Sequence, residues 1–282
     1  MSVVKRLIPI LVGSALLGAC ATQRPPTPAT VPDLMPGWLI GYLAENERVN
    51  MSNVIPAPPA KNSTMQAEDD AVSRAALSLR GSARWKQGTK DAELLFPDAA
   101  QIFSCALGAP ITEKDTPYLY QLLRRAGTDS GLATQNPKKL YQRPRPFLVN
   151  KQPICPAEDP EKIKSSGSYP SGHSAPGQTW AMILAELAPD RAEALFNRAQ
   201  DYALSRVVCN VHWLSDTVEG RNVGSYVYAV LQSNAAFRSD MEVAREELAK
   251  VRAQKLPPNS DCAAEAEALK TRIPIEGWPN KR

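Results

Sequence analysis

The chain has 282 residues, and 43% of them are hydrophobic, as expected for an ordinary globular core. This length suits one large domain or two small ones, and no change in composition divides the middle of the chain. The formal net charge of +4 at neutral pH gives no reason to expect nucleic-acid binding.

The N-terminal end is typical of a bacterial export signal. Two basic residues precede an apolar run, Leu7–Leu17, which is too short to span a bilayer. Small residues then precede Cys20, as in bacterial lipoproteins, which are cleaved before the cysteine and lipidated on it. We expect a signal peptide at residues 1–19 and a periplasmic protein, lipid-anchored at Cys20, in the outer membrane. An ordinary cleaved signal with a chance cysteine is the alternative.

Prolines and hydrophobic periodicity divide the rest of the chain into a tether, a helical domain and a tail. Five prolines between residues 21 and 36 predict an extended tether over residues 20–36. A helical domain is expected over residues 37–255, where an early proline cluster, Pro56–Pro59, predicts an irregular arm packed on the core. Residues 256–282 form a C-terminal tail. No later stretch is apolar for long enough to cross a membrane, so the lipid is the only membrane contact expected.

Helical periodicity dominates the domain. We predict helices from about Asp69, over Leu94–Phe103, from Thr112, from about Ser171 to Pro189, from Ala192 to about Cys209, from about His212 through Val230, and over Asp240–Lys250. Runs of alternating β-branched residues and internal repeats are absent from the sequence. The predicted fold is therefore all-α, a single helical bundle rather than an α/β sheet.

Besides Cys20, four cysteines remain, an even number for an oxidising compartment. No CxxC spacing is present, so we expect no zinc site. Three pairings are possible. We favour Cys155 with Cys209, because each lies just outside a segment that we place at one site, and Cys105 with Cys262 would then join the tail to the body. Free buried thiols are the alternative.

The most informative stretch is Ser205–Asp216, which holds Arg206, His212 and Asp216. His212 and Asp216 are four residues apart, so on a helix they would share a face. Asp216 would then fix the tautomer of His212 and leave the other ring nitrogen to act as a nucleophile or a proton carrier.

A second segment, Gly167–His173, contains the sequence Pro-Ser-Gly-His. Ser171 and Gly172 can present backbone amides at the first turn of the following helix, where an anion binds without a metal. His173 would lie beside that anion. The alternative is a capped helix start with an incidental histidine.

A third segment, Lys138–Pro146, offers four cations: Lys138, Lys139, Arg143 and Arg145. Such clusters are usually solvated surface, but the two prolines stiffen the backbone around the arginines, which suits a fixed guanidinium. The chain has two histidines, and each lies in one of the other two segments. Positive charge, a nucleophile and a proton donor are what phosphoryl transfer requires.

The spacing resembles the three-part signature of the type 2 phosphatidic acid phosphatase superfamily: Lys138, six residues, Arg145-Pro146; Pro170-Ser171-Gly172-His173; and Ser205-Arg206, five residues, His212, three residues, Asp216. The flanking residues resemble the bacterial class A non-specific acid phosphatases, from roughly Pro56 to Glu247. The resemblance implies the helical fold of the acid phosphatase and vanadium-dependent haloperoxidase type. It also implies a phosphomonoesterase that needs no metal or other cofactor.

By position in that signature, His212 would be the nucleophile that forms a phosphohistidine, and Asp216 would orient it. His173 would protonate the leaving alcohol and then deprotonate the attacking water. The phosphate would be held by Lys138, Arg145, Arg206, Ser171 and the Gly172 amide. Lys139 and Arg143 occupy positions outside the signature and are left out of the site.

A soluble acid phosphatase has three alternatives: a vanadate-dependent haloperoxidase, a lipid phosphate phosphatase, and an inactive lipoprotein binding module. The expected partner is a small phosphate monoester. Leu94–Pro97 departs from the small polar residues of the class A pocket, which leaves the substrate open. Tyr169, Trp180 and Trp213 suit the core better than a leaving-group pocket. Class A relatives often dimerise, although no apolar stripe in the sequence demands it.

Overall fold

The computed structural model describes residues 27–156 and 159–275. The expected signal peptide and Cys20 lie outside the described residues. The longer helices are α1 (Thr64–Ala76), α2 (Ala83–Lys90), α5 (Pro117–Ala133), α6 (Gln135–Tyr141), α9 (Ser174–Leu187), α10 (Ala192–Val208), α11 (Leu214–Leu231), α12 (Ala235–Ala253) and α13 (Cys262–Lys270). Shorter elements connect them: β1 (Asp33–Met35), β2 (Trp38–Leu39), η1 (Glu45–Glu47), η2 (Met51–Asn53), η3 (Leu77–Leu79), α3 (Asp98–Gln101), α4 (Ser104–Leu107), α7 (Pro146–Asn150), α8 (Pro160–Ile163) and η4 (Pro189–Arg191).

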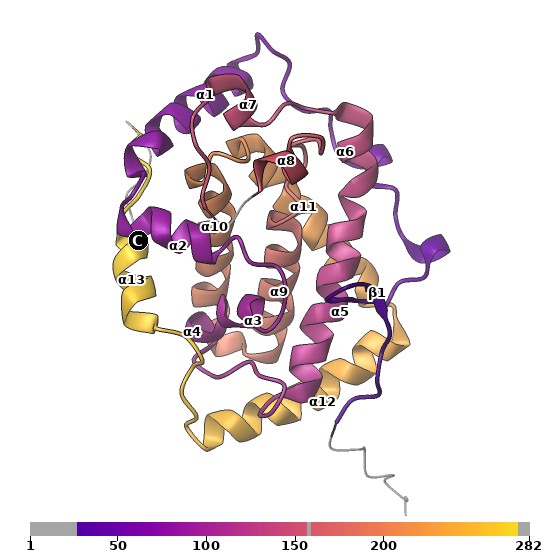
Figure 1. Cartoon of the computed structure of the whole chain (residues 1–282). Helices are drawn as coiled ribbons and strands as arrows, with labels where there is room; N and C mark the ends of the chain where they lie inside the picture. The colour runs from indigo at the N-terminus through magenta and orange to yellow at the C-terminus, as the bar shows by residue number, and fades with distance from the viewer. Residues whose placement is uncertain (1–26, 157–158, 276–282) are drawn as a thin grey trace, which may run out of the picture.

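Helix α9 is the centre of the bundle. Eleven of its fourteen residues are buried, because it is apolar on nearly every side. Helices α5, α10 and α11 pack around it, with α5 and α10 on opposite sides in Figure 1. Trp180, on α9, lies in this core, and Tyr169 and Trp213 are buried as well. The all-α prediction is confirmed, and so is the prediction that these aromatic residues are core.

Two glycines bring α11 against the start of α9. A Cβ atom at Gly224 would lie 2.3 Å from the carbonyl oxygen of Ala175, and one at Gly220 would lie 2.6 Å from that of Ser171. Any larger residue would push the helices apart. This close approach brings the Pro-Ser-Gly-His segment against the helix that carries Asp216.

Outer helices complete the body. Helix α12 packs on α5, α2 packs on α10, and α13 packs on α2. Both favoured disulfides are present, Cys105–Cys262 and Cys155–Cys209. The first ties α4 to α13, so the C-terminal tail is held on the body. Within the part of the chain that the structure describes, no helix is both long enough and apolar enough to cross a bilayer.

Several elements differ from the sequence prediction. In place of one helix over residues 94–103, the structure has the one-turn helices α3 and α4, and Pro97 stands immediately before α3. The expected helix at Thr112 begins only at Pro117, because the Thr112 and Thr116 side chains close a turn first. The sequence does not predict helices α2, α6, α7 and α8, nor α13 within the expected tail. It also does not predict the antiparallel pair of β1 and β2, which lies at the end of the expected tether and the start of the arm.

Candidate active site

The three signature segments meet at one place, and hydrogen bonds cross-link each pair of segments. These bonds run from Ser168 N to Arg143 O (2.8 Å), from Ser171 N to Asp216 O (2.9 Å) and from Arg145 Nη1 to Val211 O (2.9 Å). The short helices α6, α7 and α8 lie around this end of the bundle, at the top of Figure 1. The site is therefore assembled from parts far apart in the sequence.

His212 lies in the turn between α10 and α11. The amides of Val211 and His212 both donate to the carbonyl oxygen of Arg206, which ties the turn to the last turn of α10. The side chain is only 2% exposed. The predicted helical face shared by His212 and Asp216 is wrong, because His212 lies before the helix. Helix α11 begins at Leu214, and Trp213 caps it in an extended conformation.

The imidazole of His212 nevertheless contacts both expected neighbours. Its Nδ1 lies 3.4 Å from Asp216 Oδ2, and its Nε2 lies 3.1 Å from Arg145 Nη1. A guanidinium can only donate hydrogen bonds, so Nε2 is the acceptor and Nδ1 carries the hydrogen that faces the carboxylate. The unprotonated nitrogen thus points to the cationic side of the site.

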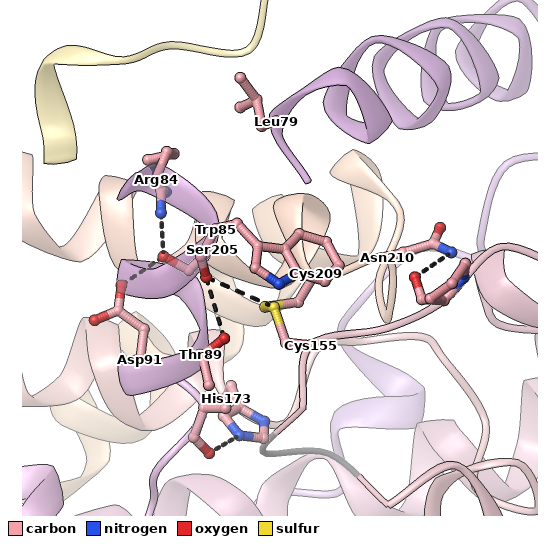
Figure 2. Close-up of a disulfide and its surroundings, with 12 residues drawn as sticks. Leu79, Arg84, Trp85, Thr89, Asp91, Cys155, His173, Ser205, Cys209 and Asn210 are labelled. Carbon is pink, nitrogen blue, oxygen red and sulfur yellow. Dashed lines mark hydrogen bonds between the residues drawn. A yellow bond between two sulfur atoms is a disulfide. The ribbon is translucent and has the colours of Figure 1, made fainter. Parts of the chain in front are cut away.

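The turn that carries His212 is fixed from outside. Cys209 is bonded to Cys155, and Asn210 adopts a left-handed conformation with φ of 60° (Figure 2). The amides of Asn210 and Asn150 exchange hydrogen bonds of 2.8 and 3.1 Å. Asparagine tolerates this backbone conformation better than most residues. The disulfide and the amide pair together set the position of the nucleophile candidate.

Asp216 is fully buried at the first turn of α11. Its Oδ2 accepts from the Trp213 amide at 2.8 Å and from the Ser168 hydroxyl, and its Oδ1 accepts from Arg143 at 2.6 Å. Burial raises the pKa of the Asp216 carboxyl, and the guanidinium of Arg143, the hydroxyl of Ser168 and the amide of Trp213 oppose that rise. All these donors favour the carboxylate, which then faces His212.

Arg143, which we left out of the site, is part of its support. It is buried and bridges Asp216 to Asp69 on α1, with Nη2 2.7 Å from Asp69 Oδ2. Asp69 in turn accepts the amide of Ser215 at 2.8 Å. The sequence assigns no role to Ser168, but the structure places its hydroxyl in contact with both Asp216 and His212. Lys139, by contrast, is exposed.

The cations predicted to bind phosphate are buried around His212. Lys138 Nζ donates to Gly167 O at 2.7 Å, Arg145 faces the imidazole, and Arg206 is 1% exposed. Burial and the nearby charge of Arg145 lower the pKa of Lys138 to about 7, although Asp216 opposes the shift. Burial, followed by Arg145, Lys138 and Arg206, lowers the pKa of His212 well below its usual value.

The Pro-Ser-Gly-His segment contributes differently from our prediction. The Ser171 amide donates to Asp216 O, so it stabilises the site's backbone instead of facing an anion. The Ser171 hydroxyl accepts from Ser174, and Gly172 lies against the Lys138 side chain. His173 caps α9 at the rim, with Nε2 3.0 Å from the carbonyl oxygen of Ala92 (Figure 2).

No group of three or more His, Cys, Asp or Glu side chains suited to a metal ion occurs within residues 27–156 and 159–275. The charge at the centre of the site is carried by lysine and arginine. The arrangement offers a neutral imidazole beside cations, which is chemically able to act as a nucleophile, with a second histidine at the rim.

Known proteins resemble this chain over most of its length. The PAP2 superfamily matches residues 118–238. A non-specific acid phosphatase of Salmonella typhimurium is 39% identical over 208 residues, which are 73% of this chain and 83% of that protein. An acid phosphatase of Zymomonas mobilis is 40% identical over 206 residues, 72% of this chain and 76% of that protein.

A non-specific acid phosphatase of Providencia stuartii is 37% identical over 224 residues, 79% of this chain and 88% of that protein. A solved transmembrane PAP2-type phosphatidylglycerolphosphate phosphatase from Bacillus subtilis aligns with a TM-score of 0.44 and 20% identity, over 61% of this chain and 87% of that one. These curated relatives cover 72–79% of the chain, and the PAP2 match over residues 118–238 includes all three segments. The chain belongs to the class A non-specific acid phosphatases of the PAP2 superfamily, and it is a phosphoric monoester hydrolase.

Proposed function

We propose that the protein hydrolyses soluble phosphate monoesters of many alcohols without a metal, through a phosphohistidine on His212. The observation that carries the proposal is the position of the imidazole between a carboxylate, 3.4 Å from Nδ1, and a guanidinium, 3.1 Å from Nε2. A carboxylate on one nitrogen fixes the tautomer and stabilises the positive charge that develops when the other nitrogen attacks.

In the first step, Nε2 of His212 bonds to phosphorus while the bond from phosphorus to the alcohol oxygen breaks. That oxygen takes a proton from His173 and leaves as the alcohol. Because the carbonyl of Ala92 can only accept, Nε2 of His173 keeps its hydrogen, and Nδ1 is the nitrogen that we assign to proton transfer. Water then attacks phosphorus, gives its proton to His173 and releases phosphate from His212.

The nonbridging phosphate oxygens would be held by Lys138, Arg145 and Arg206, with the Ser171 hydroxyl and the Gly172 amide beside them. These side chains supply in a buried site the charge stabilisation for which many phosphatases use metal ions. Arg145 would transfer its Nη1 hydrogen bond from the imidazole to the phosphate. Charge that is already in place when the substrate arrives lowers the barrier without reorganisation.

The pKa shifts suit hydrolysis in acid. A histidine with its pKa lowered well below the usual value stays neutral, and therefore nucleophilic, at acidic pH. The lowered pKa of Lys138, about 7, means that its charge is present below neutrality and is lost as the pH rises above it. His173 must also start protonated to act as the acid. All these requirements favour turnover in acid.

The experiment is hydrolysis of a chromogenic aryl phosphate at about pH 5 to 7, with EDTA present, by the wild type and by His212→Ala. We expect metal-independent release that the substitution abolishes. Activity that needs added metal, or that survives in His212→Ala, would contradict the mechanism. Halide oxidation with added vanadate, in place of hydrolysis, would support the haloperoxidase alternative.

We further propose that the protein is exported to the periplasm and anchored to the outer membrane by lipid on Cys20. The basis is the sequence of the N-terminal segment. Incorporation of labelled fatty acid that Cys20→Ser abolishes would support this proposal. Unlabelled wild-type protein released in soluble form would contradict it.

A further inference from the structure

A cavity of about 380 Å³ lies beside His173. Gly172 and His173 line one side, and the β1–β2 hairpin lines another with Leu34, Met35 and Trp38. The volume falls within the roughly 300–1,000 Å³ that small-molecule sites occupy. The expected proton donor is therefore part of the cavity wall, and Gly172 beside it lies against the Lys138 side chain.

The remaining lining is apolar or already hydrogen-bonded. Leu94 and Leu132 add apolar surface. The hydroxyl of Thr128 donates to Arg124 O within α5 at 3.3 Å, and the amide of Gln135 at the start of α6 donates to Gly131 O on α5 at 3.2 Å. Among the described residues that line the cavity, none is Asp, Glu, Lys or Arg. A charged or hydroxyl-rich group placed there would lose water without a matched replacement.

The hairpin wall is fixed to the bundle. Just after β2, the amide of Tyr42 donates to the Asp129 carboxylate on α5 at 2.7 Å. The hairpin turn packs on the loop before α3, since a Cβ at Gly37 would lie 3.1 Å from the Leu95 side chain. Yet Leu34 and Met35 remain 44% and 50% exposed. Fixed apolar side chains that stay half exposed at a cavity are suited to contact a ligand.

The loop that contains Ala92 and Leu94 connects the apolar wall of the cavity to His173. The carbonyl of Ala92 accepts the hydrogen bond that orients His173, and Leu94, two residues later, lines the cavity. The proton donor and the apolar wall are thus held in one fixed relation. A substrate with its phosphate among the buried cations would place its alcohol oxygen near His173 and its carbon skeleton in the cavity.

Resting on the function proposed above, we propose that this cavity binds the leaving group and that the protein prefers phosphate monoesters of apolar or aromatic alcohols. Leu34, Met35, Trp38 and Leu94 are then the residues that determine specificity. Esters of sugars and other polyols would react more slowly, because their hydroxyl groups find few partners in the cavity.

The test compares kcat/KM for hexyl and ethyl phosphate. Both are primary alkyl esters, so their leaving groups match in basicity and differ in apolar surface. Each fully buried methylene raises kcat/KM by about fourfold, and a hexyl chain is four methylenes longer than an ethyl chain. With partial burial of these methylenes, we expect kcat/KM to be about tenfold or more higher for hexyl phosphate. Leu94→Ser and Leu34→Ser should each lower this ratio by about threefold, because hexyl phosphate loses apolar contact in the cavity. Leu140→Ser, at a position 61% exposed on α6, is the matched control and should leave the ratio unchanged.

Equal kcat/KM for the two esters in the wild type would overturn the inference while leaving the proposed function standing. So would a preference that persists unchanged in both leucine variants. Leu34 is exposed enough that its substitution should not impair folding, so the test does not depend on Leu94→Ser alone. A wild type that hydrolyses neither ester, with His212 intact, would contradict the proposed function itself, and the inference would fail with it.

Discussion

The two sides of the candidate active site are built in different ways. On the nucleophile side, His212, Asp216 and Arg143 are buried and joined by hydrogen bonds and ion pairs that reach Asp69 on α1. On the leaving-group side, His173 is half-buried at the rim, and the walls are apolar. If the proposed function is correct, the phosphoryl group, which is common to every substrate, meets a fixed polar network, whereas the variable alcohol meets non-directional apolar surface.

The largest expected effect is on the leaving-group side. His173→Ala should lower kcat on the order of 10²–10⁴ for alkyl phosphates, and less for nitrophenyl phosphate, whose leaving group needs little protonation. Steady-state rates over a series of esters of graded leaving-group basicity would measure this. An equal loss for every ester would mean that His173 does not protonate the leaving group.

On the nucleophile side, Arg143→Gln should leave the buried carboxylates of Asp69 and Asp216 without their shared cation. We expect a loss of about 3–5 kcal/mol in the free energy of unfolding. In the protein that remains folded, kcat should fall more than substrate affinity, because the carboxylate that orients His212 is displaced. Lys139→Gln removes an exposed cation from the same segment and is the control, with an expected change within about 0.5 kcal/mol. Equal effects of the two substitutions would contradict a positioning role for Arg143.

Comparing the two disulfides separates the effect of a crosslink on stability from its effect on the position of His212. Removing either pair by double serine substitution should cost about 2–5 kcal/mol in unfolding free energy. Only the Cys155–Cys209 pair borders the turn that carries His212, so its loss should also lower kcat at temperatures where both variants are folded. The variant without Cys105–Cys262 is the control, because that bond does not border the turn. It closes the longer loop, with a sequence separation of 157 against 54 for Cys155–Cys209. Equal kcat in the two variants would show that the disulfide does not position the turn.

The smallest effect concerns the charge of Lys138. With its pKa lowered to about 7, the ammonium is charged below that pH and neutral above it, so anion affinity should fall as the pH rises. Sulfate keeps its charge in this range, and its inhibition constant should rise by up to about tenfold between about pH 7 and pH 8. Lys138→Arg should flatten this dependence, because a guanidinium stays charged. The same slope in both proteins would exclude Lys138 as its source.

The spacing of the signature predicted that His212, Asp216, Lys138, Arg145 and Arg206 lie together, and the structure brings them together. Arg143 was missed because its role depends on Asp69, which lies 74 residues earlier and is brought to it only by the packing of α1. The sequence correctly predicted the contact between His212 and Asp216, but it was wrong about the backbone, because the two residues do not share a helix. A helix start capped by Trp213 puts the histidine in the preceding turn, which local sequence does not reveal.

The leaving-group side was the least predictable region. Leu94–Phe103 has helical periodicity, yet Pro97 divides it, and Leu94 lines the cavity. The hairpin that forms the opposite wall lies where prolines predicted a tether and an irregular arm. Its position depends on Asp129, a buried carboxyl on a distant helix. Periodicity reveals core helices well, but it does not reveal which short irregular segments they hold in place.

The most direct test of the account is to trap the phosphoenzyme. Wild type and His173→Ala would be mixed with nitrophenyl phosphate, quenched in alkali, where phosphohistidine survives, and digested for mass spectrometry. We predict one phosphoryl group on His212, at higher occupancy in His173→Ala, because water attack then lacks its base. A phosphoryl group on another residue, or turnover by His173→Ala with no phosphoenzyme, would contradict the central claim that His212 is the nucleophile.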